Sequence, residues 1–149
     1  MEIHYDFIDE YLNVEEDDII HRPASEEIIF YRAVAAGALD VVQENCNNKS
    51  FADSRGVGIL SDNPVRNMKY HFVVSVALIT RFCIEAGMEF EEGFRLSDRY
   101  IRKMDMLDST PKILLLHNQM AMDFTTRMRM QKKGATSSKQ VAAAIDYTQ

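Results

Sequence analysis

The sequence predicts an all-α domain of five to six helices, packed like a bundle around one central buried helix at about residues 62–86. Three observations favour this fold class. The longest apolar run, residues 72–79, lies in a stretch of about 23 residues between helix-end signals, which is long for a strand but ordinary for a buried helix. The other apolar patterns also repeat at helical spacing. No two-residue hairpin signal appears between them.

Composition and charge narrow the classes of function. The chain has 149 residues, 46% of them hydrophobic and 27% charged, which is typical of one soluble globular domain. A net charge of −6 argues against nucleic-acid binding by this chain alone. The uncharged run between His71 and Arg81 is too short to span a bilayer. The isolated Cys46 and Cys83, with an acidic N-terminus that lacks a signal-peptide pattern, predict a cytoplasmic protein with reduced thiols.

The N-terminal part divides into an acidic lead-in and a pair of helices. Residues 1–24 contain a single arginine and no lysine, and we expect a solvated charge run there. Ser25 is the expected N-cap of the next helix, which Gly37 is expected to break. Its apolar face would comprise Ile28, Ile29, Tyr31, Val34 and Ala35. Helical spacing resumes over residues 39–46, and residues 47–59 are predicted to be a polar connecting loop.

The central helix carries signals at both ends. Ser61 or Asp62 can act as its N-cap, since a short side-chain oxygen accepts a hydrogen bond from an otherwise unpaired amide. Pro64 suits the first turn, because an N–H at that position has no partner within the helix. Gly87 can adopt the left-handed conformation that commonly ends a helix.

One face of this helix mixes polar and apolar residues. At i, i+4, i+7, i+11, i+14 and i+18 spacing it contains Asn67, His71, Val74, Leu78, Arg81 and Glu85. Three interpretations stay open: a solvent-facing surface with an Arg81–Glu85 ion pair, a polar lining of a ligand cavity, or a dimer contact. On the second interpretation the candidate ligand-binding residues are Asn67, His71, Arg81 and Glu85.

Two further helices follow Gly87. The first runs over about residues 89–107, with an expected buried stripe of Phe90, Phe94, Ser97, Ile101 and Met104. The second begins at Pro111 and reaches about Met130, with an inner side of Ile113, Leu116, Met120, Phe124 and Met128. Apolar residues that point away from this side form the candidate homodimer surface: Leu114, Leu115, Met122 and Met130. Cover by the N-terminal segment of the same chain is the alternative.

The composition changes after residue 130. Residues 131–140 (QKKGATSSKQ) are basic, small and rich in Ser and Gly, which predicts a linker that follows a helical domain at 25–130. A short amphipathic helix starts with residues 141–149 and has no C-cap signal. We therefore expect the chain to be cut short at the start of a second domain.

Motifs for catalysis and metal binding are absent from the sequence. It contains no G-x-S-x-G, H-E-x-x-H or C-x-x-C pattern, and its four histidines lie on different expected elements. The sequence therefore predicts a protein that is not an enzyme and that needs no metal or cofactor.

Three patterns carry a resemblance to a known family. They are L-S-D-N-P-x-R-N-x-K-Y (60–70), A-L-x-x-R-x-x-I-E-x-G (77–87) and S-D-x-Y-I-x-K (97–103). Over roughly residues 20–130 the chain resembles the all-helical N-terminal domain of AraC/XylS-type bacterial transcription factors, of the kind found in Firmicutes. The later pattern S-x-x-V-x-x-A-I-D-Y (138–147) resembles the opening helix of that family's DNA-binding domain, which carries two helix-turn-helix motifs.

The resemblance implies a function. The chain would be the effector-sensing or dimerisation domain of a transcriptional regulator, and only a missing C-terminal domain would contact DNA. A homodimer would match paired DNA half-sites. The effector would be a small molecule that the sequence does not identify, and the sugar site of the family's β-barrel founding member does not carry over. A stand-alone helical adaptor for protein–protein interactions is the alternative.

Overall fold

The computed structural model describes residues 24–52 and 58–147, with only the helical backbone for residues 136–147. Within these residues the protein has five α-helices, one short 3-10 helix and no strand, so the predicted all-α fold class is confirmed. The expected acidic lead-in lies outside the described residues except for Ala24.

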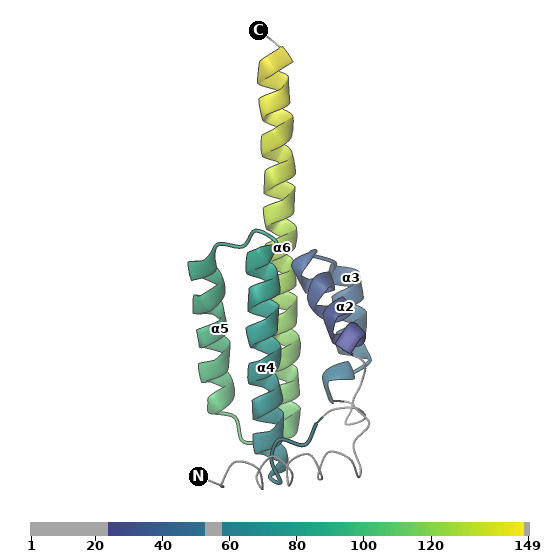
Figure 1. Ribbon diagram of the computed structural model, residues 1–149, viewed down its shortest axis with the longest axis vertical. Coiled ribbons are helices and arrows are strands. Elements are labelled where there is room, and N and C mark those ends of the chain that lie inside the picture. Colours follow the sequence, from purple (N-terminus) through teal and green to yellow (C-terminus); the bar gives the residue numbers. More distant parts are fainter. Residues whose placement is uncertain (1–23, 53–57, 148–149) are drawn as a thin grey trace, which may run out of the picture.

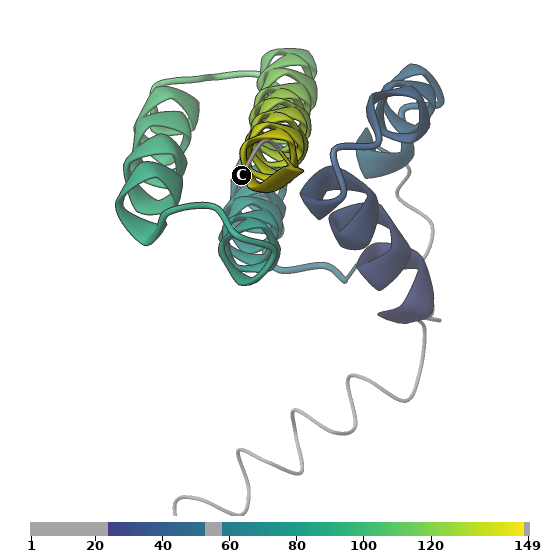
Figure 2. The ribbon, with the colours of Figure 1, turned by 90° about the horizontal axis from the view of Figure 1, so that it is seen from above.

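Two long helices form the centre of the bundle. The elements are α2 (Ala24–Ala35), α3 (Leu39–Asn47), the 3-10 helix η1 (Ser50–Ala52), α4 (Pro64–Glu85), α5 (Phe90–Asp105) and α6 (Thr110–Tyr147). Helices α4 and α6 lie side by side, with α5 on one side and α2 and α3 on the other (Figures 1 and 2). Beyond the bundle, α6 continues alone (Figure 1).

The core lies where α4 and α6 face each other. The fully buried apolar side chains there are Phe72, Val76, Ile79 and Cys83 of α4 and Ile113, Met120, Ala121, Phe124 and Met128 of α6. Burying one large apolar side chain contributes about 1.5–3 kcal/mol, so this contact is a major source of stability. The predicted central helix and the predicted inner side of the last helix are both confirmed.

Glycine ends two of the helices. Gly37 (φ 70°) follows α2, and Gly87 (φ 117°) follows α4. After α4, the Gly87 N–H donates to the Ile84 carbonyl oxygen at 3.0 Å, and the Met88 N–H donates to the Cys83 carbonyl oxygen at 2.9 Å. These two bonds form a Schellman motif, which satisfies carbonyl groups that the helix end leaves unpaired. The predicted stop signals at both glycines are confirmed.

The start of α4 differs from the expectation, because Asn63 is its N-cap instead of Ser61 or Asp62. The Asn63 side-chain oxygen accepts a hydrogen bond from the Arg66 N–H at 3.0 Å. Ser61 accepts one from the Asn63 N–H at 3.2 Å. Pro64 occupies the first turn as predicted. Three adjacent residues can all act as caps, and the path of the backbone decides among them.

Replacing Asn63 with alanine is expected to lower the free energy of unfolding by about 1 kcal/mol, because the Arg66 N–H loses its acceptor. Asp62→Ala is the matched control one residue earlier, and we expect it to change this free energy by less than about 0.5 kcal/mol. Urea denaturation of the two variants measures the difference. Equal losses would show that Asn63 does not cap the helix.

The buried face of α5 also differs from the expectation. Phe90 and Phe94 were expected in the buried stripe, but they are 57% and 41% exposed. Ser97 and Met104 are buried as predicted, Ile101 is half-buried, and the other buried residues are Gly93, Leu96 and Tyr100. Gly93 explains the rotation, since a Cβ atom there would lie 3.1 Å from Ile84 Cγ1. A residue without a side chain therefore lies against Ile84 and Thr80 of α4, while the Phe90 and Phe94 rings are largely exposed.

The start and outer side of α2 need a similar correction. The helix begins at Ala24, so Ser25 lies in its first turn and is not the N-cap. Ile28 and Ile29 are 36% and 63% exposed, whereas the later members of the predicted apolar face, Tyr31, Val34 and Ala35, are buried. Only the second half of α2 therefore contributes to the core.

The predicted linker is helical. Helix α6 does not end at Met130 but runs without interruption to Tyr147, so residues 131–140 continue the bundle helix. The side chains of residues 131–135 are exposed, and nothing lies within 4 Å of a Cβ atom built at Gly134. Lysine, glutamine and alanine favour helices, and they outweigh the cost of one glycine. The start of a second domain at residues 141–149 stays a prediction.

Candidate functional site

A polar cluster lies inside the bundle between α4 and α6. The Ser75 hydroxyl oxygen and the His117 Nε2 atom are 2.7 Å apart, and these residues are only 6% and 3% exposed. Tyr31 of α2 adjoins them. Burial and the charge of Glu27 raise the pKa of Tyr31 to about 12, while a hydrogen bond with Ser75 acts in the opposite direction. Three helices thus contribute one polar side chain each to a single buried site.

Aromatic rings surround His117. The Phe51 ring of η1 stacks on the imidazole with centroids 3.6 Å apart and planes inclined by 4°. The Phe30 and Phe72 centroids are 6.5 Å and 5.8 Å away, and the Phe72 ring is nearly perpendicular to the imidazole. The second nitrogen, His117 Nδ1, is buried and has no hydrogen bond to any described residue. A buried polar atom in this state costs about 1–3 kcal/mol.

The charge state of His117 limits the chemistry of the cluster. Burial lowers the pKa of His117 to about 3, so the imidazole is neutral at pH 7. A catalytic triad needs a carboxylate on the second histidine nitrogen and a serine that a substrate can reach. No described residue bonds His117 Nδ1, and Ser75 is buried. In this geometry the Ser75 hydroxyl pairs with a neutral imidazole and is shielded from solvent.

The sequence patterns alone did not identify this cluster. Ser75 and His117 lie 42 positions apart, and each is unremarkable in its own helix. One signal pointed to the site, because Ser75 is the only polar residue in the apolar run 72–79. A hydroxyl on the buried side of a helix needs a hydrogen-bond partner, and the fold supplies His117.

The mixed stripe of α4 does not converge on one site. At its N-terminal end, the Asn67 Oδ1 atom accepts a hydrogen bond from the Leu60 N–H at 2.7 Å. His71 Nε2 lies 2.5 Å from the Gly58 carbonyl oxygen and donates to it, since a carbonyl only accepts. Both side chains fasten the segment before α4 to the helix, which gives them a structural role.

The other end of the stripe is exposed. Arg81 donates to the Ala77 carbonyl oxygen at 2.9 Å, and its guanidinium carbon lies 5.8 Å from the centroid of the Phe94 ring. Glu85 is exposed, and the described residues contain no Arg81–Glu85 ion pair. Val74, midway along the stripe, is 49% exposed. These positions favour the solvent-facing interpretation, and a ligand role for the stripe stays a prediction.

The candidate dimer residues of α6 separate into two pairs. Leu115 and Met130 are 59% and 67% exposed. Leu114 and Met122 are half-buried, and Met122 packs against the core. Met122 therefore does not point away from the core as expected, whereas the other three residues stay a predicted dimer surface. A contact between two chains can use Leu115 and Met130 without disturbing the fold.

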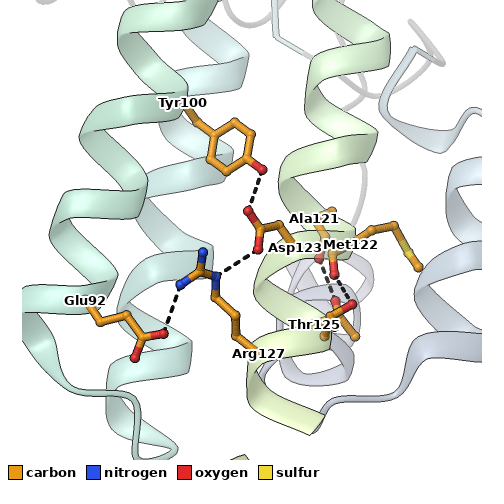
Figure 3. Close-up of polar contacts among 8 residues, drawn as sticks. Glu92, Tyr100, Ala121, Met122, Asp123, Thr125 and Arg127 are labelled. Carbon is orange, nitrogen blue, oxygen red and sulfur yellow. Dashed lines mark hydrogen bonds and ion pairs between the residues drawn. The ribbon is translucent and has the colours of Figure 1, made fainter. Parts of the chain in front are cut away.

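A second polar cluster ties α5 to α6 (Figure 3). The Tyr100 hydroxyl donates to Asp123 Oδ2 at 2.6 Å, and Arg127 Nε donates to Asp123 Oδ1 at 2.8 Å. A third bond of 3.1 Å joins Arg127 to Glu92 of α5. Burial and the hydrogen bond to Asp123 raise the pKa of Tyr100 far above its usual value. Both carboxylates already pair with Arg127, which indicates a structural connection between the helices.

Comparisons with known proteins give no information about this site. No protein-family model, curated protein or solved structure matches this chain. Among the described residues, no three or more histidine, cysteine, aspartate or glutamate side chains form a group that could hold a metal ion. No helix in the described part of the chain combines the length and the apolar character needed to cross a membrane.

Proposed function

We propose that this chain is an effector-sensing and dimerisation domain of a bacterial transcriptional regulator of the AraC/XylS type. The three patterns behind the resemblance coincide with structural units. Residues 60–70 contain the N-cap of α4 and Asn67, which fastens the preceding segment. Residues 77–87 end at Gly87 of the Schellman motif. Residues 97–103 lie on α5 and include the buried Ser97 and Tyr100.

The main support for this proposal is that α6 continues beyond the bundle as one unbroken helix. The helix belongs to the core as far as Met128, is exposed over residues 129–135, and continues as a helix to Tyr147 (Figure 1). Two turns hold it where it leaves the bundle. A Cβ atom at Gly37 would lie 2.7 Å from the Arg129 backbone, and the Gln131 side chain donates to the Gly87 carbonyl oxygen. A change in core packing would therefore move the projecting part of α6.

This arrangement suits a regulator that acts on DNA through another domain. Residues 138–147, which carry the pattern of the family's first DNA-binding-domain helix, lie on the projecting part of α6. A two-fold dimer of the bundle would then place two DNA-binding domains at a fixed separation, as paired half-sites require. A helix of this length is stiff, so a shift or a rotation of α6 within the bundle would be transmitted to the DNA-binding domain.

A helical adaptor is the second candidate. The observation that favours it is the outer face of α4, where Tyr70, Val73 and Val74 are 46%, 37% and 49% exposed. An adaptor would bind its partner there and would need no contact between copies of this chain. The oligomeric state therefore separates the two candidates.

Measuring whether the chain forms a homodimer tests the proposed function directly. Sedimentation equilibrium at tens of micromolar is expected to give a homodimer. Changing both Leu115 and Met130 to glutamate is expected to dissociate it, because burying a charge in an apolar contact costs several kcal/mol. Met122 is not a suitable target, since it packs against the core of its own chain.

A matched control uses an exposed apolar residue of another helix. Ile29→Glu changes a side chain on α2 that is 63% exposed, and it should leave the dimer intact. Circular dichroism of each variant checks that the helices still form. A monomeric wild-type chain would contradict the dimerisation role, and a dimer that survives the double change would place the contact on another surface.

A further inference from the structure

The outer face of α4 is an apolar surface that the described helices leave uncovered. At helical spacing it has an apolar centre and an arginine at each end: Arg66, Tyr70, Val73, Val74, Ala77 and Arg81. The three largest apolar members are each more than a third exposed. Phe94 of α5 borders this face through its contact with the Arg81 guanidinium. A monomer rarely leaves such a patch without a partner.

The arginines at the two ends disfavour a second copy of this chain as that partner. A two-fold contact joins the same surface of both copies. If the two α4 helices were antiparallel and centred between Val73 and Val74, Arg66 of one copy would face Arg81 of the other. If they were parallel, each arginine would face its own counterpart. Neither arginine has a carboxylate partner among the described residues, so like charges would meet unscreened.

The segment that precedes α2 has the complementary chemistry. Residues 1–23 contain eight carboxylate side chains and one arginine. Their apolar side chains recur at helical spacing on one side of the pattern: Ile3, Phe7, Ile8, Tyr11 and Leu12. Carboxylates take the opposite side: Glu2, Asp6, Asp9 and Glu10. An acidic, amphipathic stretch of this kind matches an apolar surface with an arginine at each end.

This segment is also attached close to the face. Helix α2 begins at Ala24, and its start lies along the same edge of the bundle as α4, with α6 further from that edge (Figure 2). Residues 13–23 can span up to about 36 Å when extended, which allows residues 3–12 to reach across α4. A segment of the same chain acts at an effective concentration in the millimolar range, which favours it over a free partner.

We propose that the apolar side of residues 3–12 binds the outer face of α4 in the same chain. Phe7 and Tyr11 would cover the valines at its centre, and the acidic side would stay in solvent with its outermost carboxylates near Arg66 and Arg81. This inference goes beyond the proposed function, since the exposed α6 surface stays free for a dimer. The partner of an adaptor would have to displace this segment.

Nuclear magnetic resonance on the full-length wild-type chain tests the contact directly. Nuclear Overhauser effects are expected between the Val74 methyl groups and the ring protons of Phe7 or Tyr11. In a mixture of labelled and unlabelled chains, isotope-filtered spectra should show no such effect between two chains. Effects between chains would assign the face to a second copy and overturn the proposal, as would the absence of any effect between Val74 and residues 1–23.

Limited proteolysis gives a second measurement. Chymotrypsin cleaves after Phe7 and Tyr11, and the rate follows the fraction of chains in which the segment is released. Val74→Asp places a charge in the apolar centre and should speed this cleavage by at least about tenfold. Val41→Asp on α3 is the matched control, because Val41 is 51% exposed and Val74 is 49% exposed. It should keep the wild-type rate within about twofold.

Circular dichroism checks that both variants keep their helices. Equal cleavage rates for wild type and Val74→Asp would refute the contact, and so would an equal increase in Val41→Asp. Sedimentation equilibrium keeps this result separate from the proposed function. A monomer with a protected segment would refute the dimerisation role alone, whereas a dimer with an unprotected segment would refute this contact alone.

Discussion

Gly37→Ala is expected to lower the free energy of unfolding by about 3 kcal/mol or more, because two penalties combine at this position. The φ of Gly37 is 70°, where an alanine is strained. Its Cβ atom would also lie 2.7 Å from the Cα and N atoms of Arg129. Neither atom can rotate away, since both belong to the backbone of α6. The turn between α2 and α3 would have to move off the helix, and thermal unfolding would show a large fall in Tm.

Gly134→Ala is the matched control for this change. Gly134 lies on the same α6 helix, five residues after Arg129, but nothing is within 4 Å of its Cβ position. Alanine favours a helix over glycine by about 1 kcal/mol, so this variant is expected to keep or slightly raise the stability. Similar melting temperatures for the two variants would mean that the Gly37 turn does not pack against α6 as described.

Acidification is expected to destabilise the protein through His117. The pKa of His117 is about 3 in the folded state and about 6.5 in the unfolded chain, so only the unfolded chain binds this proton between those values. The contribution of neutral His117 to stability is therefore fully present above pH 6.5 and is lost as the pH falls towards 3. Between pH 7 and pH 4 this group should account for a loss of about 3 kcal/mol.

The comparison with His117→Phe isolates this effect from the titration of carboxylates. Both proteins contain the same aspartates and glutamates, so the difference between their pH profiles belongs to His117. We expect a flatter profile for His117→Phe in urea denaturation from pH 7 to pH 4. Parallel profiles for wild type and His117→Phe would show that His117 is not held neutral by burial.

The amino-acid pattern was sufficient to predict those elements whose signals lie within a few residues of each other. Helical spacing located α4 and the inner side of α6, and the glycines at 37 and 87 marked two helix ends with the correct backbone conformation. These features depend on local sterics and on the side of a helix that must avoid water, so they are visible in a short window. The same local signals did not distinguish Asn63 from Ser61 and Asp62 as the N-cap of α4.

Which helix surfaces contact each other depends on the packing of the whole fold. The buried face of α5 includes Gly93, which lies close to Ile84 of α4. Phe90 and Phe94 are left largely exposed, although they are more hydrophobic than Gly93. The pairing of Ser75 with His117 needs α4 and α6 to pack in one particular register. Contacts between residues far apart in the chain depend on how whole helices fit together, and spacing within one helix does not contain that information. The buried pair of Ser75 and His117 therefore follows from the packing of the two helices and not from the pattern of either one.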